Sequence, residues 1–222
     1  QSQQGNTHIL NKKNIDPNPF QQFGRWFREA IDSVPNLPEA MVLATADKKG
    51  ETSARTVLLK QFDETGFVFY TNYKSLKGKV LEENPNASLV FHWRELERQV
   101  CITGKVQRVS RQESASYFHS RPRQSQISVH ASKQSQVIKN RQELEKSFAH
   151  FTEEFEGKEI PLPPYWGGYC PSSWGYYPSY YDYYYGAGYS GINNFAISNS
   201  GAFAIIVECV IERLARQITK NV

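Results

Sequence analysis

Short segments rich in β-branched and aromatic residues, separated by turn sequences, constrain the fold of this chain most strongly. Five of them lie between residues 40 and 109, namely Ala40–Ala46, Ser53–Lys60, Phe67–Thr71, Ala87–Trp93 and Gln99–Val109. Turn sequences ending in Gly50 and Gly66 separate the first three segments, which is typical of an antiparallel meander. At least five strands with helices at the periphery predict a mainly β, α+β fold built as a small barrel.

The predicted helices flank these strands in the sequence. Apolar residues recur at helical spacing from Phe20 to Val34, and Pro19 is placed to open that helix. Further helices are predicted over Ser75–Glu83, Arg111–His119 and Arg141–Phe155. Residues 1–15 are polar and are expected to form a flexible N-terminal segment.

The composition changes abruptly after Tyr169. Ten of the thirteen tyrosines fall between Tyr165 and Tyr189, a stretch with neither helical nor strand periodicity. We therefore expect one domain over residues 16–169 and a divergent, Tyr- and Gly-rich segment over residues 170–222. The sequence leaves open whether this segment is genuine or the product of a shifted reading frame.

Charge and cysteine content exclude several classes of function. The net charge of +4 arises entirely within residues 1–169 and is too small to indicate a nucleic-acid surface. Cys101, Cys170 and Cys209 are odd in number and widely spaced, so they predict neither a zinc site nor a disulfide framework. No metal ligand set and no membrane-spanning segment is expected, and the cytoplasm is the expected location.

A basic stretch from Tyr117 to Lys133 suits a small phosphorylated ligand. It contains Arg121, Arg123 and Ser125. A guanidinium group binds a phosphate through two parallel hydrogen bonds, and hydroxyl groups add further contacts. A helix opening at Pro122, with Ser120 near its N-cap, would add a favourable anion position. A solvated basic helix face is the alternative for this stretch by itself.

The segment Ser53–Lys60 adds two more cations. In a strand, Arg55 and Lys60 would lie roughly 16 Å apart on opposite faces, so they would serve two ligands or two ends of a site. Ordinary strand-end charges are the alternative. Tyr70 and Thr71 at a strand end, with Ser75 and Lys77 at a helix start, add a second phosphate cradle. Gln99 is placed to hydrogen-bond the polar edge of a ring.

Residues 16–169 resemble the pyridoxine/pyridoxamine 5′-phosphate oxidase family. The resemblance is carried by six motifs in order, Arg-x-Val-Leu-Leu-Lys (55–60), Phe-Tyr-Thr-Asn (69–72), Glu-Arg-Gln-Val (97–100), Tyr-Phe-His-Ser-Arg-Pro (117–122), Ser-Lys-Gln-Ser (132–135) and Pro-Leu-Pro-x-x-Trp-Gly-Gly (161–168). It implies an FMN-binding split β-barrel of the antiparallel Greek-key type. It also implies a homodimer with flavin at the subunit interface.

The resemblance also implies an activity and the residues of its site. FMN would oxidise pyridoxine or pyridoxamine 5′-phosphate to pyridoxal 5′-phosphate, with dioxygen as acceptor and hydrogen peroxide as product. FMN contacts are implied for Arg55, Thr56, Val57, Leu58, Leu59, Lys60, Tyr70, Thr71, Lys77, Gln99, Gln134 and Ser135. Contacts with the substrate phosphate are implied for Lys60, Tyr117, Arg121 and Ser125. No residue is assigned a catalytic role.

The chain departs from the family pattern at several positions. Leu76 stands where the family usually has an arginine, and the N-terminal Arg-x-x-Tyr segment is not recognisable in residues 1–15. Residues 170–205 contain neither Glu-Phe-Trp-Gln-Gly nor Arg-Leu-His-Asp-Arg, which supplies the family's substrate arginine and histidine. A second hypothesis follows, namely a catalytically impaired protein that still binds FMN or the vitamer.

Overall fold

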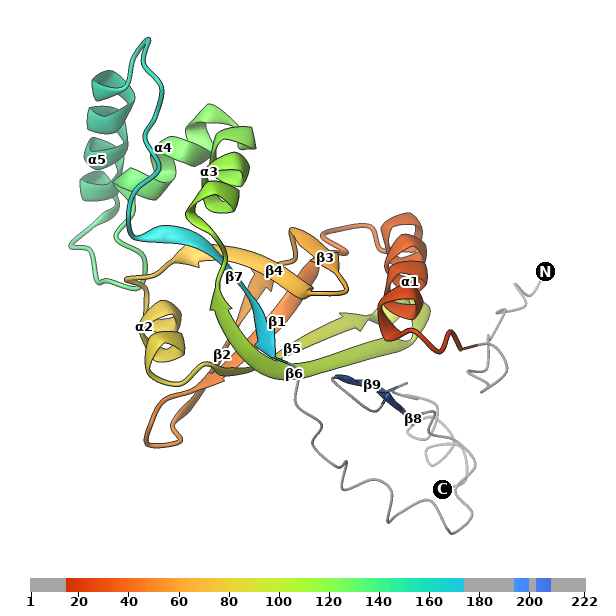
Figure 1. The fold of residues 1–222 in the computed structure, drawn as a ribbon. Coiled ribbons are helices and arrows are strands. Elements are labelled where there is room, and N and C mark those ends of the chain that lie inside the picture. Colours follow the sequence, from red (N-terminus) through yellow and green to blue (C-terminus); the bar gives the residue numbers. More distant parts are fainter. Residues whose placement is uncertain (1–14, 174–193, 200–202, 209–222) are drawn as a thin grey trace, which may run out of the picture. The chain divides into compact units, whose positions relative to one another are not determined.

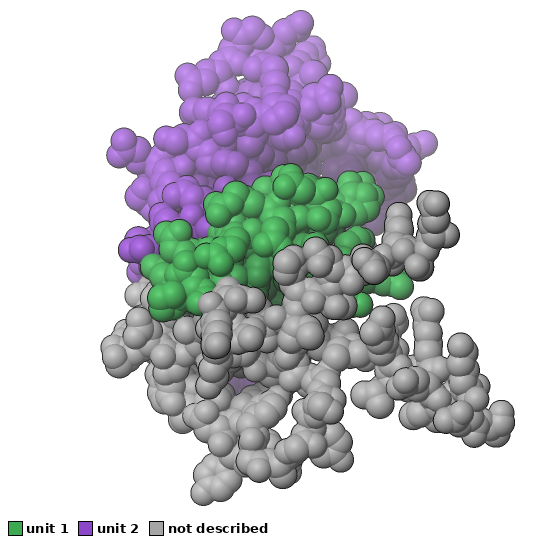
Figure 2. All heavy atoms as spheres, turned by 90° about the vertical axis from the view of Figure 1, so that its right-hand side faces the viewer, with its two compact units in different colours: residues 1–42, 88–103, 174–222 green, residues 43–87, 104–173 purple. Residues whose placement is uncertain are grey.

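The computed structural model describes residues 15–173, 194–199 and 203–208. The chain forms two compact units that interleave along the sequence, drawn in two colours in Figure 2. Unit 1 comprises residues 1–42, 88–103 and 174–222, and unit 2 comprises residues 43–87 and 104–173. Within the described part of the chain, no helix has the length and apolar character needed to cross a membrane.

The described residues form nine strands and five α-helices (Figure 1). The strands are β1 (Ala40–Ala46), β2 (Thr52–Leu58), β3 (Gln61–Asp63), β4 (Gly66–Asn72), β5 (Asn86–Trp93), β6 (Arg98–Arg108), β7 (Trp166–Ser173), β8 (Asn194–Asn199) and β9 (Phe203–Glu208). Their order in the sheet is β2-β1-β5-β6-β7-β4-β3, and β9 pairs with both β6 and β8. The pairs β3–β4, β4–β7, β6–β7, β6–β9 and β8–β9 are all antiparallel. The predicted mainly β, α+β fold is confirmed.

Helix α1 (Pro19–Ser33) belongs to unit 1 and begins where the sequence predicts. Pro19 occupies its start, and the Asn18 side chain accepts hydrogen bonds from the backbone N–H groups of Phe20 and Gln21. Phe23 is buried and packs against Phe91 and Trp93 of β5, with ring centroids 5.1 and 5.9 Å apart. The apolar residues that recur at helical spacing in this helix therefore belong to the hydrophobic core.

Strand β4 lies at the centre of unit 2. Its burial is almost continuous, and it pairs with β7 on one edge and with β3 on the other. In the β4–β7 register Tyr70 faces Gly168 and Asn72 faces Trp166. Strand β7 also pairs with the end of β6, with a register shift between Lys105 and Val106. The pairing brings Tyr70 and Trp166 together from positions far apart in the sequence.

The helices of unit 2 are α2 (Leu76–Glu83), α3 (Arg111–Ser120), α4 (Arg123–Ala131) and α5 (Arg141–Glu154). Ser75 caps α2. A short 3-10 turn at Arg94–Leu96, which belongs to unit 1, joins β5 to β6. Phe118 of α3 and Ile127 of α4 form a buried cluster with Phe155, Ile160 and Trp166. This cluster fixes α3 and α4 against the start of β7.

Two local expectations are wrong. Pro122 does not occupy the first turn of a helix capped by Ser120, because α3 continues to Ser120, whose hydroxyl donates to the Tyr117 carbonyl oxygen at 2.8 Å. Pro122 is instead the extended N-cap residue of α4 and supplies no side-chain cap. The predicted strand Ser53–Lys60 ends at Leu58, so strict alternation does not extend to Lys60.

Only part of the C-terminal segment is described. Strand β7 continues past the composition break to Ser173, and β8 and β9 form an antiparallel pair in unit 1. The remainder of residues 170–222 and the N-terminal residues 1–14 lie outside the described residues. The expected domain boundaries and the shifted-frame hypothesis stay predictions.

Candidate functional site

A cavity of about 490 Å³ lies within unit 2 and collects residues from six segments of the chain. Of the residues predicted from the sequence, the lining includes Thr56, Val57, Leu58, Lys60, Tyr70, Thr71, Lys77, Tyr117, Arg121 and Gln134. The end of β2, strand β4 and the start of α2 supply one group of these side chains. Helix α3 and the connection that follows α4 supply the others. Segments that are separate in the sequence therefore meet at one site.

The other predicted site residues do not line this cavity. Leu59 is buried in the core at 4% exposure, and Gln99 belongs to unit 1, where its amide nitrogen lies 3.6 Å from Cys101 Sγ. Ser125 lies in the first turn of α4. Ser135 adopts a left-handed φ of 64° directly after Gln134. Arg55 holds its guanidinium among polar groups of β1 and β2. Their roles toward a ligand stay predictions.

Two buried or half-buried cations at one end of the site have only neutral partners. Lys77 is 8% exposed, and its Nζ donates to Thr71 Oγ1 at 3.3 Å. The Arg55 guanidinium donates to Thr45 Oγ1 at 2.8 Å, to Ser53 Oγ at 2.6 Å and to the Leu43 carbonyl oxygen at 3.2 Å. Among the residues that the structure describes, neither cation forms an ion pair.

The pKa shifts of these cations agree with that arrangement. Burial lowers the pKa of Lys77, and the positive charge of Arg55 lowers it further. Burial also lowers the pKa of Arg55. Withdrawing a charge from water without an opposite charge nearby is unfavourable, so a bound anion would relieve both groups. The start of α2 strengthens this end, because its N-terminus attracts negative charge.

An aromatic stack and a third cation form the other part of the site. The rings of Tyr70 and Tyr117 stack with centroids 4.0 Å apart, and Trp166 stacks on Tyr70 at 5.4 Å. Arg121 Cζ lies 5.0 Å from the centroid of the Trp166 ring. Arg121 Nη1 is buried without a hydrogen-bond partner, and burial lowers the pKa of this guanidinium, although Tyr117 opposes the shift.

The Tyr70 hydroxyl group of this stack is neutral at physiological pH. Burial raises the pKa of Tyr70 to about 12, and the nearby negative charge of Glu113 contributes to the rise. The site therefore combines unpartnered positive charge with flat apolar surfaces and neutral hydroxyl groups. This combination suits planar ligands that carry phosphate. In the described residues no cluster of His, Cys, Asp and Glu side chains is arranged to hold a metal ion.

Five lining residues were missed by the sequence-based assignment. They are Asn72, Ser128, Val129, Ser132 and Trp166. Asn72, Ser132 and Trp166 stand inside the motifs quoted above, so the motifs carried the signal although the residues were not singled out. Ser128 and Val129 follow Ser125 by three and four positions, which on a helix is the same face. Correct placement of α4 would have found them.

Comparison with known sequences connects the site to one family. Residues 27–154 match the family described as "Pyridoxamine 5'-phosphate oxidase". A protein of Rubrobacter xylanophilus named pyridoxine/pyridoxamine 5′-phosphate oxidase is 52% identical over 160 residues, which cover 72% of this chain and 74% of the relative. A protein of the same name from Paraburkholderia phymatum is 53% identical over 160 residues, covering 72% and 75% of the two chains.

Solved structures support the same fold. The structure of PhzG from Burkholderia lata 383, in complex with tetrahydrophenazine-1-carboxylic acid, aligns with a TM-score of 0.69 and 28% identity over 75% of this chain and 83% of the other. A pyridoxamine 5′-phosphate oxidase-related, FMN-binding protein from Nostoc punctiforme aligns with a TM-score of 0.54 and 14% identity, covering 69% and 80%. These likenesses confirm the predicted split-barrel fold.

Proposed function

Because the chain belongs to the pyridoxamine 5′-phosphate oxidase family, we propose that it is an FMN-dependent oxidase. Its substrates would be pyridoxine 5′-phosphate and pyridoxamine 5′-phosphate, and its product pyridoxal 5′-phosphate. The observation that carries the proposal is the cavity of unit 2, where the lining residues Lys77 and Arg121 have no anionic partner among the described residues, and neither does Arg55, which does not line it. Two phosphorylated ligands, cofactor and substrate, would supply the missing negative charge.

The residues of the cavity fit FMN at the end formed by β2, β4 and α2. Lys77, Thr71 and the start of α2 would hold the phosphate, since an ammonium group and a helix N-terminus both attract it. The β2 backbone from Thr56 to Leu58 would lie along the flavin. When bound, FMN supplies the redox chemistry that oxidises the vitamer and passes the electrons to dioxygen, giving hydrogen peroxide.

The residues at the other end would bind and orient the substrate. Arg121 and Tyr117 would hold the vitamer phosphate, with Lys60 at the same cavity and Ser125 in the first turn of α4. This grip is remote from the carbon that reacts. Its binding energy would therefore be used to orient that carbon and to keep the neighbouring ring in place.

A catalytically impaired binding protein is the second candidate. The sequence observation that favours it is the absence of Arg-Leu-His-Asp-Arg from residues 170–205. Without the arginine and histidine of that motif, phosphate binding would survive while the alignment of the reacting groups would suffer. Loss of such alignment lowers the turnover number more than the affinity.

One experiment tests the proposal and separates the two candidates. The purified chain is loaded with FMN, supplied with each phosphorylated vitamer in air, and assayed for pyridoxal 5′-phosphate and peroxide. Equal amounts of both products support the oxidase. Tight vitamer binding with little product supports the impaired protein, and replacing residues 170–222 by a tail bearing both missing motifs should then raise kcat with little change in affinity. A chain that takes up no FMN refutes the oxidase, and a chain that binds neither FMN nor the vitamer refutes both candidates.

The family membership also supports a homodimer that works in the cytoplasm without nucleic acid or membrane partners. Size-exclusion chromatography with light scattering and detection of flavin absorbance tests the oligomeric state. A dimer carrying flavin is the expected species. A monomer that retains flavin would contradict the expected site at a subunit interface.

A further inference from the structure

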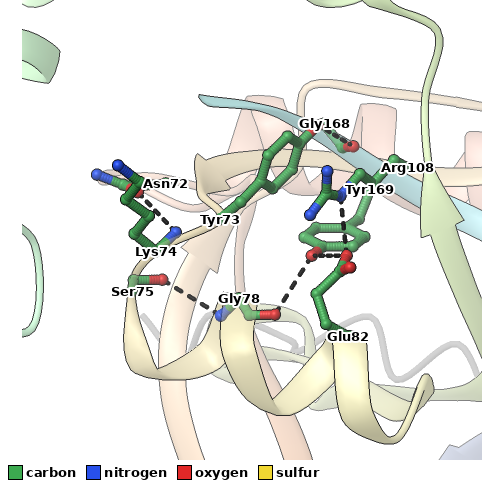
Figure 3. Close-up of polar contacts among 9 residues, drawn as sticks. All are labelled: Asn72, Tyr73, Lys74, Ser75, Gly78, Glu82, Arg108, Gly168 and Tyr169. Carbon is green, nitrogen blue, oxygen red and sulfur yellow. Dashed lines mark hydrogen bonds and ion pairs between the residues drawn. The ribbon is translucent and has the colours of Figure 1, made fainter. Parts of the chain in front are cut away.

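Side chains from three other segments contact helix α2 or its residue Glu82. We call Tyr73, Glu82, Arg108 and Tyr169 the α2 clamp, and Figure 3 shows Glu82 on the helix with the other three side chains close to it. Arg108 Nε of β6 donates to Glu82 Oε1 at 2.8 Å. The hydroxyl group of Tyr169 on β7 is shared between Glu82 Oε1 at 3.2 Å and the Gly78 carbonyl oxygen at 3.4 Å. These contacts tie two turns of the helix to two strands.

Tyr73 completes the clamp, because both Arg108 and Tyr169 pack against its ring. The Arg108 guanidinium lies 4.1 Å above its ring, and Tyr169 meets that ring edge-on with centroids 5.3 Å apart. The Tyr73 hydroxyl donates to the Gly168 carbonyl oxygen at 3.2 Å. A Cβ atom built on Gly78 would lie 2.4 Å from the Tyr73 carbonyl oxygen, so the helix touches the preceding backbone directly.

The clamp is poorly explained as a source of stability alone. Arg108 and Glu82 have side chains 46% and 48% exposed, and ion pairs that exposed contribute little to stability. Tyr169 differs, being 2% exposed, and burial followed by the charge of Glu82 raises the pKa of its hydroxyl. That hydroxyl therefore stays protonated and donates to the helix at any physiological pH.

Gly78 connects the clamp with the ligand end of α2. Its backbone N–H donates to the capping Ser75 Oγ at 3.3 Å, while its carbonyl oxygen accepts from Tyr169. Lys77 precedes it, lines the cavity and bonds Thr71. Because an eight-residue helix moves nearly as a rigid body, a displacement where Glu82 is held would be transmitted to Lys77.

We propose that Glu82, Arg108 and Tyr169 are positioning residues that aim Lys77 and the start of α2 at the phosphate of FMN. The inference rests on the proposed function, since it presumes that this end of the cavity receives the cofactor phosphate. None of the three residues lines the cavity, so an effect on the cofactor would be indirect, and their contacts with Glu82 and Gly78 give it a route through the helix. The residues act on the phosphate end of FMN and leave the flavin ring end unchanged.

Comparison of FMN with riboflavin, which lacks the phosphate, tests the proposal. Tyr169→Phe removes only the hydroxyl group, and Arg108→Met removes the guanidinium while keeping an apolar chain over Tyr73. The matched control is Arg141→Met, which breaks an exposed ion pair of α5, Arg141 Nε to Glu145 Oε1 at 2.7 Å, away from the clamp. Apoprotein of each variant is titrated with each flavin, and thermal unfolding checks its fold.

We expect both clamp variants to lose roughly three- to tenfold in FMN affinity, as is usual for coupled neighbours, with riboflavin affinity unchanged. Arg108→Lys should restore part of the loss, and Arg141→Met should change neither affinity. If the clamp variants lose both flavins equally, or neither, the positioning role is wrong. If the original chain does not distinguish FMN from riboflavin, the proposed function fails first. Should Tyr169→Phe not fold, Arg108→Met decides by itself.

Discussion

Replacing Arg121 with methionine should weaken vitamer binding without lowering the stability of the apoprotein against unfolding. Arg121 Nη1 is buried and has no hydrogen-bond partner, so this guanidinium has been withdrawn from water without full compensation. Methionine is close in length and keeps an apolar chain beside Trp166, which the guanidinium contacts at 5.0 Å. The substitution therefore removes a ligand contact and an unsatisfied buried donor at the same time.

The two effects differ in size and sign. Loss of a charge-assisted phosphate contact costs about 1.5–3 kcal/mol, or roughly 10- to 150-fold in Kd. In the apoprotein, removal of the unsatisfied donor recovers about 1–3 kcal/mol, while loss of the cation–π contact costs about 0.5–2 kcal/mol. Together these ranges change the free energy of unfolding by between about −1 and +2.5 kcal/mol, so on balance we expect little loss of stability.

Calorimetric titration of the FMN-loaded protein with pyridoxal 5′-phosphate and urea unfolding of the apoprotein measure the two effects. Arg123→Met is the matched control, because Arg123 donates to the carbonyl oxygens of Phe155 and Lys158, the latter at 3.0 Å. The control should lose stability and keep vitamer affinity. If Arg121→Met instead destabilises the apoprotein by more than about 1 kcal/mol, or lowers FMN and vitamer affinity equally, Arg121 is a structural residue.

Three further predictions concern α2. Leu76 is 57% exposed beside Lys77, so Leu76→Arg should raise FMN affinity at low salt in a fluorescence titration, with less gain at high salt. Burial and Arg55 lower the pKa of Lys77, so FMN affinity should fall as the pH rises through that lowered pKa and Lys77 loses its proton; Lys77→Met should abolish that dependence. Gly78→Ala should destabilise the chain by about 1–3 kcal/mol in urea, because the clash with the Tyr73 backbone outweighs alanine's helix preference of about 1 kcal/mol.

Local signals were sufficient for most of the secondary structure. Alternating and aromatic-rich segments placed β1, β4 and β5 within one residue of their observed ends. The helix start at Pro19 and the cap at Ser75 were also readable, because proline and a capping serine act on their immediate neighbours. The position of Pro122 was predicted wrongly, because the local preference of proline is ambiguous. Proline is compatible with both the first helical position and the extended residue before it, and the sequence does not choose between them.

The cavity wall required information that no local pattern carries. Trp166 joins the site because β7 pairs with β4, and Tyr70 and Trp166 are separated by 96 positions along the chain. Gly168 allows that approach, since a Cβ atom there would lie 2.9 Å from the Tyr70 ring. The motifs named the segments correctly, but the contact between the two rings follows from tertiary pairing alone.

The roles of the arginines illustrate the same limit more sharply. Charge alone makes Arg121 and Arg123 equivalent members of a basic stretch, and only the family resemblance singled out Arg121. In the structure Arg123 is bonded to two carbonyl oxygens, while Arg121 keeps a buried nitrogen without a partner. Arg108 is likewise committed to Glu82 and Tyr73. A positive charge that a fold buries and leaves unpartnered is costly, so its retention is better explained by a ligand than by folding. The candidate site is therefore distinguished by which cations the protein leaves uncompensated, and only the folded chain reveals that.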